Sequence, residues 1–262
     1  IAAVAGIGVG GLSLALMMRD FAFPTISDFH LANSYTGGGG TNVVNVILVD
    51  FRGYDTFGEI IVLGIAALVI FALTEALLKG PANARLLAWV PDQKRAGDRH
   101  PLMLVVATRV SLPIAIMVGV YIFLRGHNEP GGGFIAGLVV AIALLMQYMA
   151  SGFAWAQARQ GMDYHAMIGW GVVIAAATGL GAFFADRPFL TSAFGYFQIP
   201  PMDKFELATA MGFDLGVFLT VVGAVMLALA SLSRIAIRAG ETINTEPMGM
   251  DPSATPARGG DR

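Results

Sequence analysis

The chain has 262 residues, of which 56% are hydrophobic and 13% are charged, and it contains no cysteine. A soluble domain carries about 25% charged residues, so this composition excludes an ordinary water-soluble fold. The lack of cysteine excludes disulfides, thiolate catalysis and cysteine-bound metals within the chain. The net charge of −2 does not point to any partner, and we expect no nucleic acid among them.

Long apolar blocks follow one another along the chain. A bilayer core of ~30 Å takes about 20 helical residues, and blocks of this length cover residues 1–18, 56–79, 102–124, 133–152, 166–186 and 207–234. We therefore predict an all-α polytopic membrane protein with about six spanning helices. Ile1 opens directly into the first block without the basic segment of a signal peptide, so we expect that the chain is processed or that other residues precede it.

The segments between the blocks differ in character. Residues 19–55 form a long first loop, in which residues 41–51 are apolar but too short to span, and this favours an interfacial or re-entrant helix. Residues 80–101 contain three prolines and clustered charge, which is typical of a linker. The predicted organisation is a two-span segment at 1–80, a linker at 81–101, a four-helix membrane domain at 102–239 and a disordered tail at 240–262.

The distribution of Lys and Arg predicts the orientation. If the N-terminus, the 80–101 linker and the tail share one side, that side holds most of the Lys and Arg residues outside the spans. By the positive-inside rule, both termini are predicted to be cytoplasmic.

Four ionisable residues lie inside predicted spans, where a charge is costly and is usually paired or functional. Arg109 lies about 10 Å into its span from the predicted cytoplasmic side, and Asp214 lies about as deep from the outer side. Depth therefore suggests two pairs, Arg109 with Glu75 and Asp214 with Glu59. Two carboxyl groups close together in a low dielectric favour a proton path. The alternative for Arg109 and Glu75 is a fixed ion pair without a transport role.

A second group of charges precedes Glu59. Asp50, Arg52 and Asp55 are candidates for the same path because they lie near Glu59 in sequence. Each of them alone fits equally a solvated cluster at the membrane interface.

The sequence GHNEPGGGF at 126–134 joins the third and fourth predicted spans. Its proline suits the first turn of a helix, and its glycines leave N–H groups bare near a helix start, where anions are favoured. Histidine is the side chain whose ordinary pKa is nearest to neutrality, so His127 is a candidate proton relay. The alternative is a rigid turn that fixes two helices and docks a neighbour through Glu129, Pro130, Gly131, Gly132 and Gly133. His127 and Glu129 lack a third ligand nearby, so we predict no metal site.

The segment RVSLPIAIMVGVYIFLRGHNEPGGGFIAGLV (109–139) resembles the hallmark of the B-type subunits of the Mrp-type (Mnh, Pha) multisubunit sodium/proton antiporters, and FDLGVFLTVVG (213–223) resembles their last helix. VDFRGYDTFGEIIVLGIAALVIFAL (49–73) is similar to the C-terminal end of the large A-type subunits, a part also found as a small subunit of membrane-bound hydrogenases. Together they look like a fused A–B arrangement. The family's characteristic positions would then include Asp50, Arg52, Asp55, Glu59, His127 and Asp214.

This resemblance implies a transporter subunit of a bacterial plasma membrane and not an enzyme. It implies exchange of sodium for protons, with roles in pH homeostasis and sodium resistance, beside large antiporter-like and small membrane subunits, and it implies no cofactor. The long antiporter-like region expected at the start of an A-type subunit is not in this chain, so the chain is not expected to transport alone. The alternatives are a membrane-arm subunit of a redox enzyme related to respiratory complex I, a membrane hydrolase using His127 and Glu129, and a structural scaffold.

Overall fold

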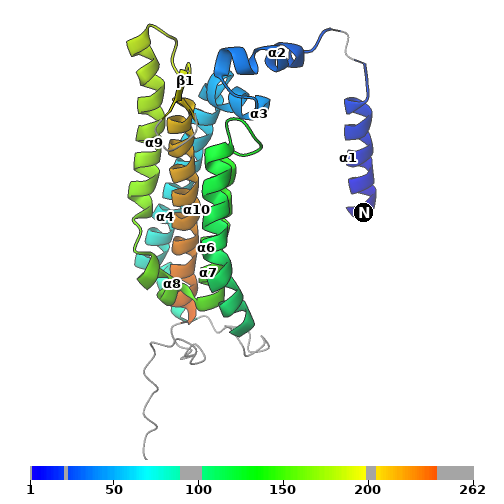
Figure 1. Cartoon of the computed structure of the whole chain (residues 1–262). Coiled ribbons are helices and arrows are strands. Elements are labelled where there is room, and N and C mark those ends of the chain that lie inside the picture. Colours follow the sequence, from blue (N-terminus) through cyan, green and yellow to red (C-terminus); the bar gives the residue numbers. More distant parts are fainter. Residues whose placement is uncertain (1, 21–22, 89–101, 199–204, 241–262) are drawn as a thin grey trace, which may run out of the picture.

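The computed structural model describes residues 2–20, 23–88, 102–198 and 205–240 (Figure 1). Five long helices lie side by side as a bundle: α4 (Gly53–Lys79), α6 (Leu102–Arg125), α7 (Gly133–Ser151), α9 (Tyr164–Gly181) and α10 (Ala210–Gly240). Each contains a stretch that is long and apolar enough to cross a bilayer. The predicted class, a polytopic all-α membrane protein, is thereby confirmed.

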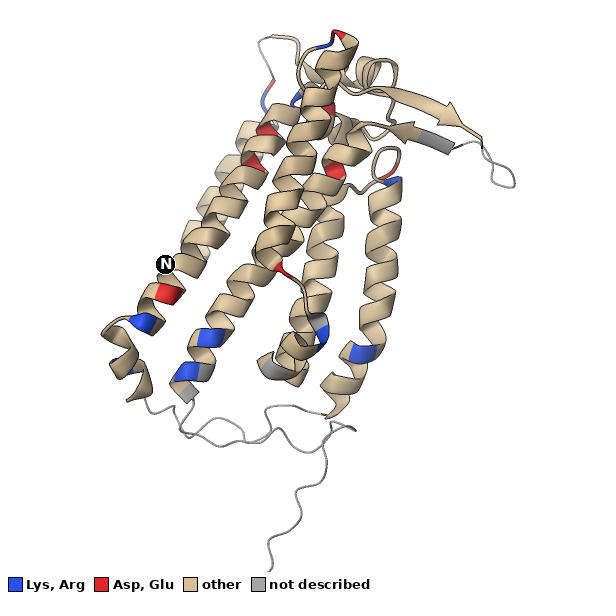
Figure 2. Ribbon diagram, turned by 90° about the vertical axis from the view of Figure 1, so that its left-hand side faces the viewer, with Lys and Arg blue, Asp and Glu red and all other residues tan. Residues whose placement is uncertain are grey.

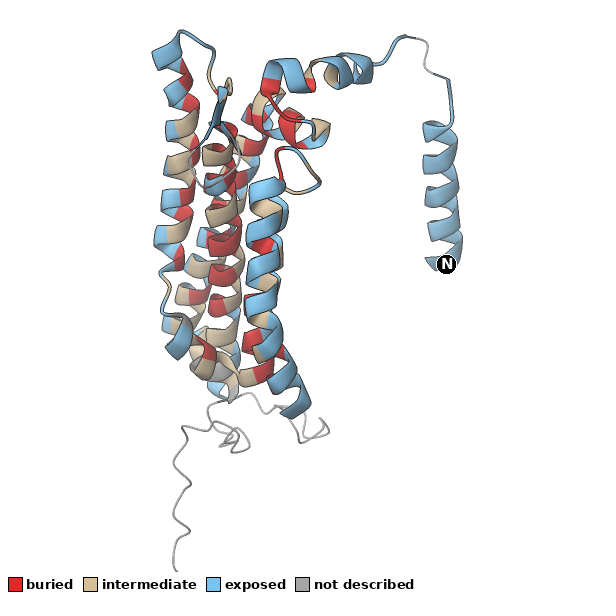
Figure 3. Ribbon diagram, in the orientation of Figure 1, coloured by how far each residue is buried: buried red, intermediate tan, exposed pale blue. Residues whose placement is uncertain are grey.

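The first predicted span forms the shorter apolar helix α1 (Ala2–Met17) of 16 residues. It stands apart from the bundle, and none of its residues is buried (Figure 3). Its glycines Gly6 and Gly10 have open space around them. The helix therefore offers its whole surface to lipid or to other proteins.

Shorter elements cap the two ends of the bundle. We call one end the hairpin end, because it carries the strands β1 and β2, and the other the linker end, because the predicted linker 81–101 begins there. The hairpin end carries α2 (Ser27–Gly38), α3 (Val43–Val46), the π-helix η1 (Ile47–Phe51), the 3-10 helix η2 (Ala182–Ala185), and the strands β1 (Phe194–Phe197) and β2 (Phe205–Ala208). The linker end carries α5 (Ala82–Leu87) and α8 (Phe153–Gln160). The helix expected within 41–51 is present as α3 and η1.

The two strands were not predicted. They pair antiparallel, with Phe194 opposite Ala208 and Phe197 opposite Phe205. The sixth span therefore begins at Ala210 and not at residue 207, because the preceding residues complete the hairpin. Most of the predicted linker, and all of the predicted tail except Gly240, lie outside the described residues.

Helix α10 is the centre of the bundle. It packs against α9, α7 and α4, whereas α6 packs on α7 at the periphery (Figure 1). The crossing of α9 and α10 is close because Gly171 meets the backbone of Gly216 there. Small residues on facing helices allow such an approach. The buried Ala175 continues this contact along α9.

Candidate functional site

The first loop is hydrogen-bonded to the turn at residues 126–132. The Asn42 side-chain amide donates hydrogen bonds to the carbonyls of Gly126 and Glu129, at 2.8 Å each. Two further bonds join the same segments: Thr41 Oγ1 to the Asn128 carbonyl at 2.7 Å and the Asn42 N–H to the His127 carbonyl at 3.2 Å. The turn thus fixes the segment that precedes α3. In this structure the docked segment is part of the same chain and not of a neighbouring protein.

The glycines of this turn are required by close contacts. Gly132 has φ of 115°, a conformation that side chains disfavour. A Cβ on Gly133 would collide with the backbone of Asp214, and one on Gly131 would collide with the carbonyl of Ile122. The start of α7 can therefore lie directly against α10.

His127 is buried within the docked turn. Its Nε2 lies 3.0 Å from the Gly38 carbonyl oxygen, and since a carbonyl only accepts, Nε2 is the donor. Nδ1 is buried and has no hydrogen-bond partner among the described residues. Glu129 forms an ion pair with Arg125 and not with His127. The described residues contain no cluster of three His, Asp or Glu that could hold a metal ion.

Asp214 is the most deeply placed carboxylate of the hairpin end. Only 7% of the residue is exposed. Its carboxylate accepts hydrogen bonds from the Gly133 N–H and, at 3.5 Å, from the Asn45 side-chain amide. The Gly133 N–H is one of the unpaired donors at the start of α7, where the helix dipole favours an anion. The glycine-rich turn therefore presents a helix start to a buried acid of α10.

A cavity of about 190 Å³ lies beside this carboxylate. Its lining includes Asp214 from α10 and Glu59 from α4, which the depth argument paired. Asn45 and Thr56 add polar groups to the wall, and the Thr56 hydroxyl is buried without a partner among the described residues. The cavity has room for several water molecules or a small cation, with two acids in its wall.

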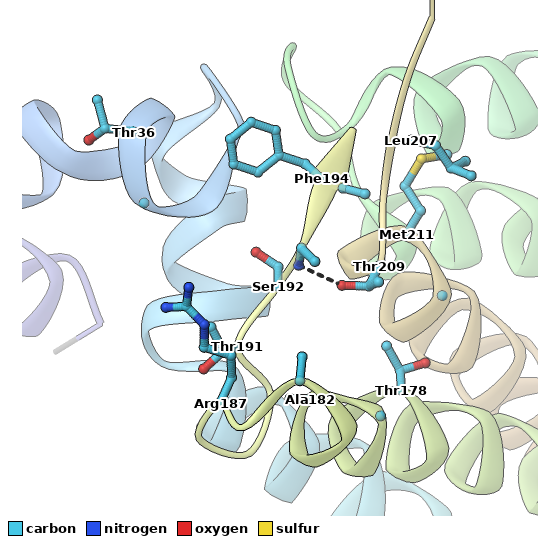
Figure 4. A pocket seen from close by; sticks show the side chains of 16 residues that line it. Thr36, Thr178, Ala182, Arg187, Thr191, Ser192, Phe194, Leu207, Thr209 and Met211 are labelled. Carbon is cyan, nitrogen blue, oxygen red and sulfur yellow. Dashed lines mark hydrogen bonds between the residues drawn. The ribbon is translucent and has the colours of Figure 1, made fainter. Parts of the chain in front are cut away.

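Asp50 occupies a separate position in the π-helix η1. Its carboxylate accepts hydrogen bonds from the Ser192 N–H at 3.1 Å and the Ser192 hydroxyl at 2.9 Å. Burial raises the pKa of the Asp50 carboxyl above its ordinary value, and the Ser192 bonds lower it by less. Ser192 also lines an open cavity of about 1000 Å³ beneath the hairpin, with Thr178, Arg187 and Thr209 (Figure 4). Asp50 therefore lies next to an opening toward the hairpin end.

Two predicted candidates, Asp55 and Glu75, form ion pairs away from the Asp214 cavity. Asp55 pairs with Arg52 at 2.5 Å on the surface, as in the alternative of a solvated cluster. Glu75 pairs with Lys79 at 2.7 Å and with Arg234 at 2.5 Å.

The predicted pair of Arg109 with Glu75 is wrong. The Arg109 guanidinium stacks over the Trp155 ring, 4.8 Å from its centroid. The two residues share a depth but not a helix interface, because α6 packs on α7 whereas α4 packs on α10.

Sequence reasoning missed three polar residues that complete the two acid sites. Asn45 is a polar residue within an apolar run, and this signal could have identified it. Thr56 faces the cavity from the first turns of α4, and Ser192 reaches Asp50 from far away in sequence. The sequence carries no local signal for the last two.

Comparison with known proteins matches both halves of the chain. Residues 103–227 match the domain related to the MnhB subunit of Na⁺/H⁺ antiporters, and residues 1–89 match MbhE, the E-type subunit of MBH. A probable K⁺/H⁺ antiporter A/B-type subunit of Rhizobium meliloti is 41% identical over 251 residues, covering 89% of this chain and 25% of the relative. The chain thus spans about a quarter of that relative's length.

Solved structures match the same fold. The Mrp complex from a Dietzia species matches with a TM-score of 0.71 and 33% identity, over 88% of this chain and 25% of that one. An archaeal membrane-bound sulfane sulfur reductase matches with a TM-score of 0.54 and 24% identity, over 90% of this chain and 96% of that one, and shows a shared fold.

The second half of the chain gives the strongest assignment. The Na⁺/H⁺ antiporter B-type subunit of Bacillus subtilis is 41% identical over 127 residues, covering 48% of this chain and 89% of that protein. The predicted resemblance to an Mrp-type A–B arrangement is confirmed by these matches. The chain belongs to the MnhB family of Mrp-type antiporter subunits.

Proposed function

We propose that the chain is a membrane subunit of a multisubunit cation/proton antiporter, and that Asp214 and Glu59 form part of its ion or proton path. The observation that carries this proposal is the cavity that both acids line, beside the helix start at Gly133. A carboxylate in the membrane interior attracts a cation or a proton to offset its cost. A scaffold would have no need for two acids around one cavity.

The relatives' names support the proposed partners and ion. Those names include both Na⁺ and K⁺ antiporter subunits, which supports exchange of a monovalent alkali cation, with sodium as the ion expected from sequence. The chain spans about a quarter of the A/B-type relative, and we propose that it acts beside large antiporter-like and small membrane subunits. We propose a bacterial plasma membrane as the location.

The orientation of the chain in that membrane rests on charge. Basic residues gather toward the linker end and acidic residues toward the hairpin end (Figure 2). By the positive-inside rule, this distribution supports a linker end that faces the cytoplasm. The cavity with Asp214 and Glu59 would accordingly lie in the outer half of the membrane.

The alternative function is the membrane arm of a redox enzyme. The fold shared with the sulfane sulfur reductase favours it, because that protein is a respiratory membrane complex. In that case, the cavity lined by the two acids would belong to a proton path driven by electron transfer.

Purification of the tagged chain from its own membranes tests the proposal. We expect large and small membrane subunits in the particle, without iron–sulfur proteins, as identified by mass spectrometry. Reconstituted into vesicles with an internal pH dye, the particle should move protons when NaCl or KCl is added but not choline chloride. An iron–sulfur subunit in the particle would favour the redox enzyme, and a chain purified alone would contradict both proposals.

The pH dependence of exchange tests the Asp50 site. Ser192→Ala removes the hydroxyl that donates to Asp50, so the pKa of Asp50 rises further and the proton is taken up at higher pH. We expect the acidic limb of the exchange profile to move to higher pH by up to about one unit. The neighbouring Thr191→Ala should leave the profile in place. An unmoved profile in Ser192→Ala would remove Asp50 from the path.

The raised pKa of Asp50 also determines how this group changes the stability of the fold with pH. The folded chain holds the Asp50 proton more tightly than the unfolded chain does, because burial raises the pKa. The stability that comes from this proton is complete below the unfolded pKa and is lost as pH rises through the folded pKa.

A further inference from the structure

The cavity beneath the hairpin has polar walls that come from both halves of the chain. Its volume is about 1000 Å³, and it lies between α2, α9, the hairpin and the start of α10. Its described lining includes five hydroxyl side chains and one guanidinium, from Thr36, Thr178, Thr191, Ser192, Thr209 and Arg187. Hydroxyls and guanidinium groups hydrogen-bond to water, and the cavity has room for tens of water molecules. Its chemistry and size therefore suit water.

The cavity reaches down into the helix bundle along α9. Its lining on this side runs from Thr178 to Ala185 of η2, which is about 10 Å at the helical rise. A Cβ on Gly212 would lie 3.1 Å from the Thr178 hydroxyl oxygen, so the bare backbone of α10 borders the cavity at this level. Figure 4 shows Thr178 on α9 and Ser192 in the segment that leads into β1. Water in the cavity would thus reach the level of the spanning helices.

Ser192 separates this cavity from Asp50. Ser192 lines the cavity, and Asp50 accepts from the Ser192 N–H at 3.1 Å and from its hydroxyl at 2.9 Å. A hydroxyl can donate one hydrogen bond and accept others at the same time. The hydroxyl that donates to Asp50 can therefore accept from a water molecule of the cavity, and one side chain joins the water to the acid.

A connection of this kind carries a proton more readily than an alkali cation. A protonated water molecule can give its proton to the Ser192 oxygen while the hydroxyl proton moves to the Asp50 carboxylate, which leaves water, an intact hydroxyl and a neutral carboxyl. Sodium or potassium would need an open passage past the serine. Burial raises the pKa of Asp50, which favours the protonated carboxyl.

The charged groups around Asp50 come from two other places. His127 of the 126–132 turn interacts electrostatically with Asp50, and it donates to the Gly38 carbonyl. Gly38 itself borders Asp50, since a Cβ there would lie 3.1 Å from Asp50 Oδ2. Arg52, two residues further along, pairs with Asp55. A proton on Asp50 is therefore next to the histidine that the sequence marked as a relay.

We propose that the cavity beneath the hairpin is a water-filled vestibule, and that protons pass from it to Asp50 through the Ser192 hydroxyl. The inference rests on the proposed function, because it names the entrance for one of the two exchanged species. The cavity between Asp214 and Glu59 is left as the site for the cation.

Site-specific thiol labelling tests whether water fills the vestibule, because the chain contains no cysteine of its own. Thr178→Cys places a thiol on the inner wall, and Ala177→Cys places one at nearly the same depth on the exposed face of α9. The whole complex in lipid nanodiscs is treated with the cationic reagent MTSET, and the adduct is read from the mass of the tagged chain. Ala177→Cys should react at least about tenfold more slowly, because the reactive thiolate forms in water and not in lipid.

Exchange after labelling tests whether protons use this route. Labelled Thr178→Cys complex, reconstituted into vesicles, should lose most of its cation-dependent proton exchange, and dithiothreitol should restore it by cleaving the mixed disulfide. Labelled Ala177→Cys complex should exchange as before labelling. If Thr178→Cys does not assemble, Met211→Cys offers a second lining position on α10.

Variants of Ser192 separate the proton from the cation. Ser192→Ala should lower the maximal rate of exchange but leave the half-saturating NaCl concentration in place, because only the proton step uses the hydroxyl. Ser192→Thr, which keeps a hydroxyl, should retain more of the rate than Ser192→Ala.

Three results would overturn the proposal. They are equal labelling of the two thiols, full exchange in the labelled Thr178→Cys complex, and a raised half-saturating NaCl concentration at unchanged maximal rate in Ser192→Ala. The last would assign Ser192 to the cation. A complex without exchange before labelling would instead contradict the proposed function, and the two thiols would still show whether water fills the cavity.

Discussion

Asp214→Asn is expected to reduce cation-dependent proton exchange by more than about tenfold while the complex stays in the membrane. Asparagine keeps the shape of the side chain and an oxygen that can accept from the Gly133 N–H, so the contact between α7 and α10 is retained. The charge is lost, and with it the group that can hold a cation or a proton next to the cavity. The measurement is the pH change inside vesicles after addition of NaCl or KCl.

Asp186→Asn is the matched control for this variant. Asp186 lies at the same end of the bundle and is exposed, and its φ of 52° is one that asparagine adopts readily. The same chemical change there should leave exchange intact. Undiminished exchange in Asp214→Asn, at equal amounts of complex, would show that the buried acid is structural.

Gly171→Ala should lower the thermal stability of the subunit, whereas Gly169→Ala on the same helix should not. A Cβ at position 171 would lie 2.7 Å from the Gly216 carbonyl oxygen and 2.7 Å from the Thr220 nitrogen, both of which are backbone atoms of α10. Backbone cannot turn aside as a side chain can, so α9 and α10 must separate. We expect a loss of about 1–3 kcal/mol or more, as for overpacked cores.

The control works because the two glycines differ in surroundings and not in chemistry. Gly169 has open space where its Cβ would be, and alanine favours helix formation over glycine by about 1 kcal/mol. Gly169→Ala should therefore be neutral or slightly stabilising in a detergent melting experiment on the complex. Equal melting of both variants would contradict the close crossing of α9 and α10.

Hydropathy predicted the long helices because length and apolar content decide whether a segment can span. It also placed Asp214 and Glu59 at one depth, and they line one cavity because α4 and α10 are neighbours. The same depth argument failed for Arg109 and Glu75, since depth says nothing about which helices touch. A single sequence contains no direct information about that adjacency.

The parts that escaped prediction depend on contacts between distant residues. The hairpin has only four residues in each strand, too few to show a β pattern, and the strands pair across a loop. Small residues recur at a spacing of four in α9, in two overlapping pairs that fit close helix packing equally well. Ala175 and Gly179 are buried, whereas Ala177 and Gly181, at the same spacing, are exposed. The spacing sets which residues share a face, but neighbouring helices decide which face is used.

The docking of the first loop on the 126–132 turn has a consequence for how this subunit is encoded. The Asn42 amide and two carbonyls of the turn connect a segment that matches one family to a segment that matches another. If the two segments were on separate chains, the same docking would have to form between those chains. Covalent fusion gives the two segments a high effective concentration for each other, so a few hydrogen bonds suffice here. Two separate chains would need a tighter contact, or a third protein, to hold the same turn in place.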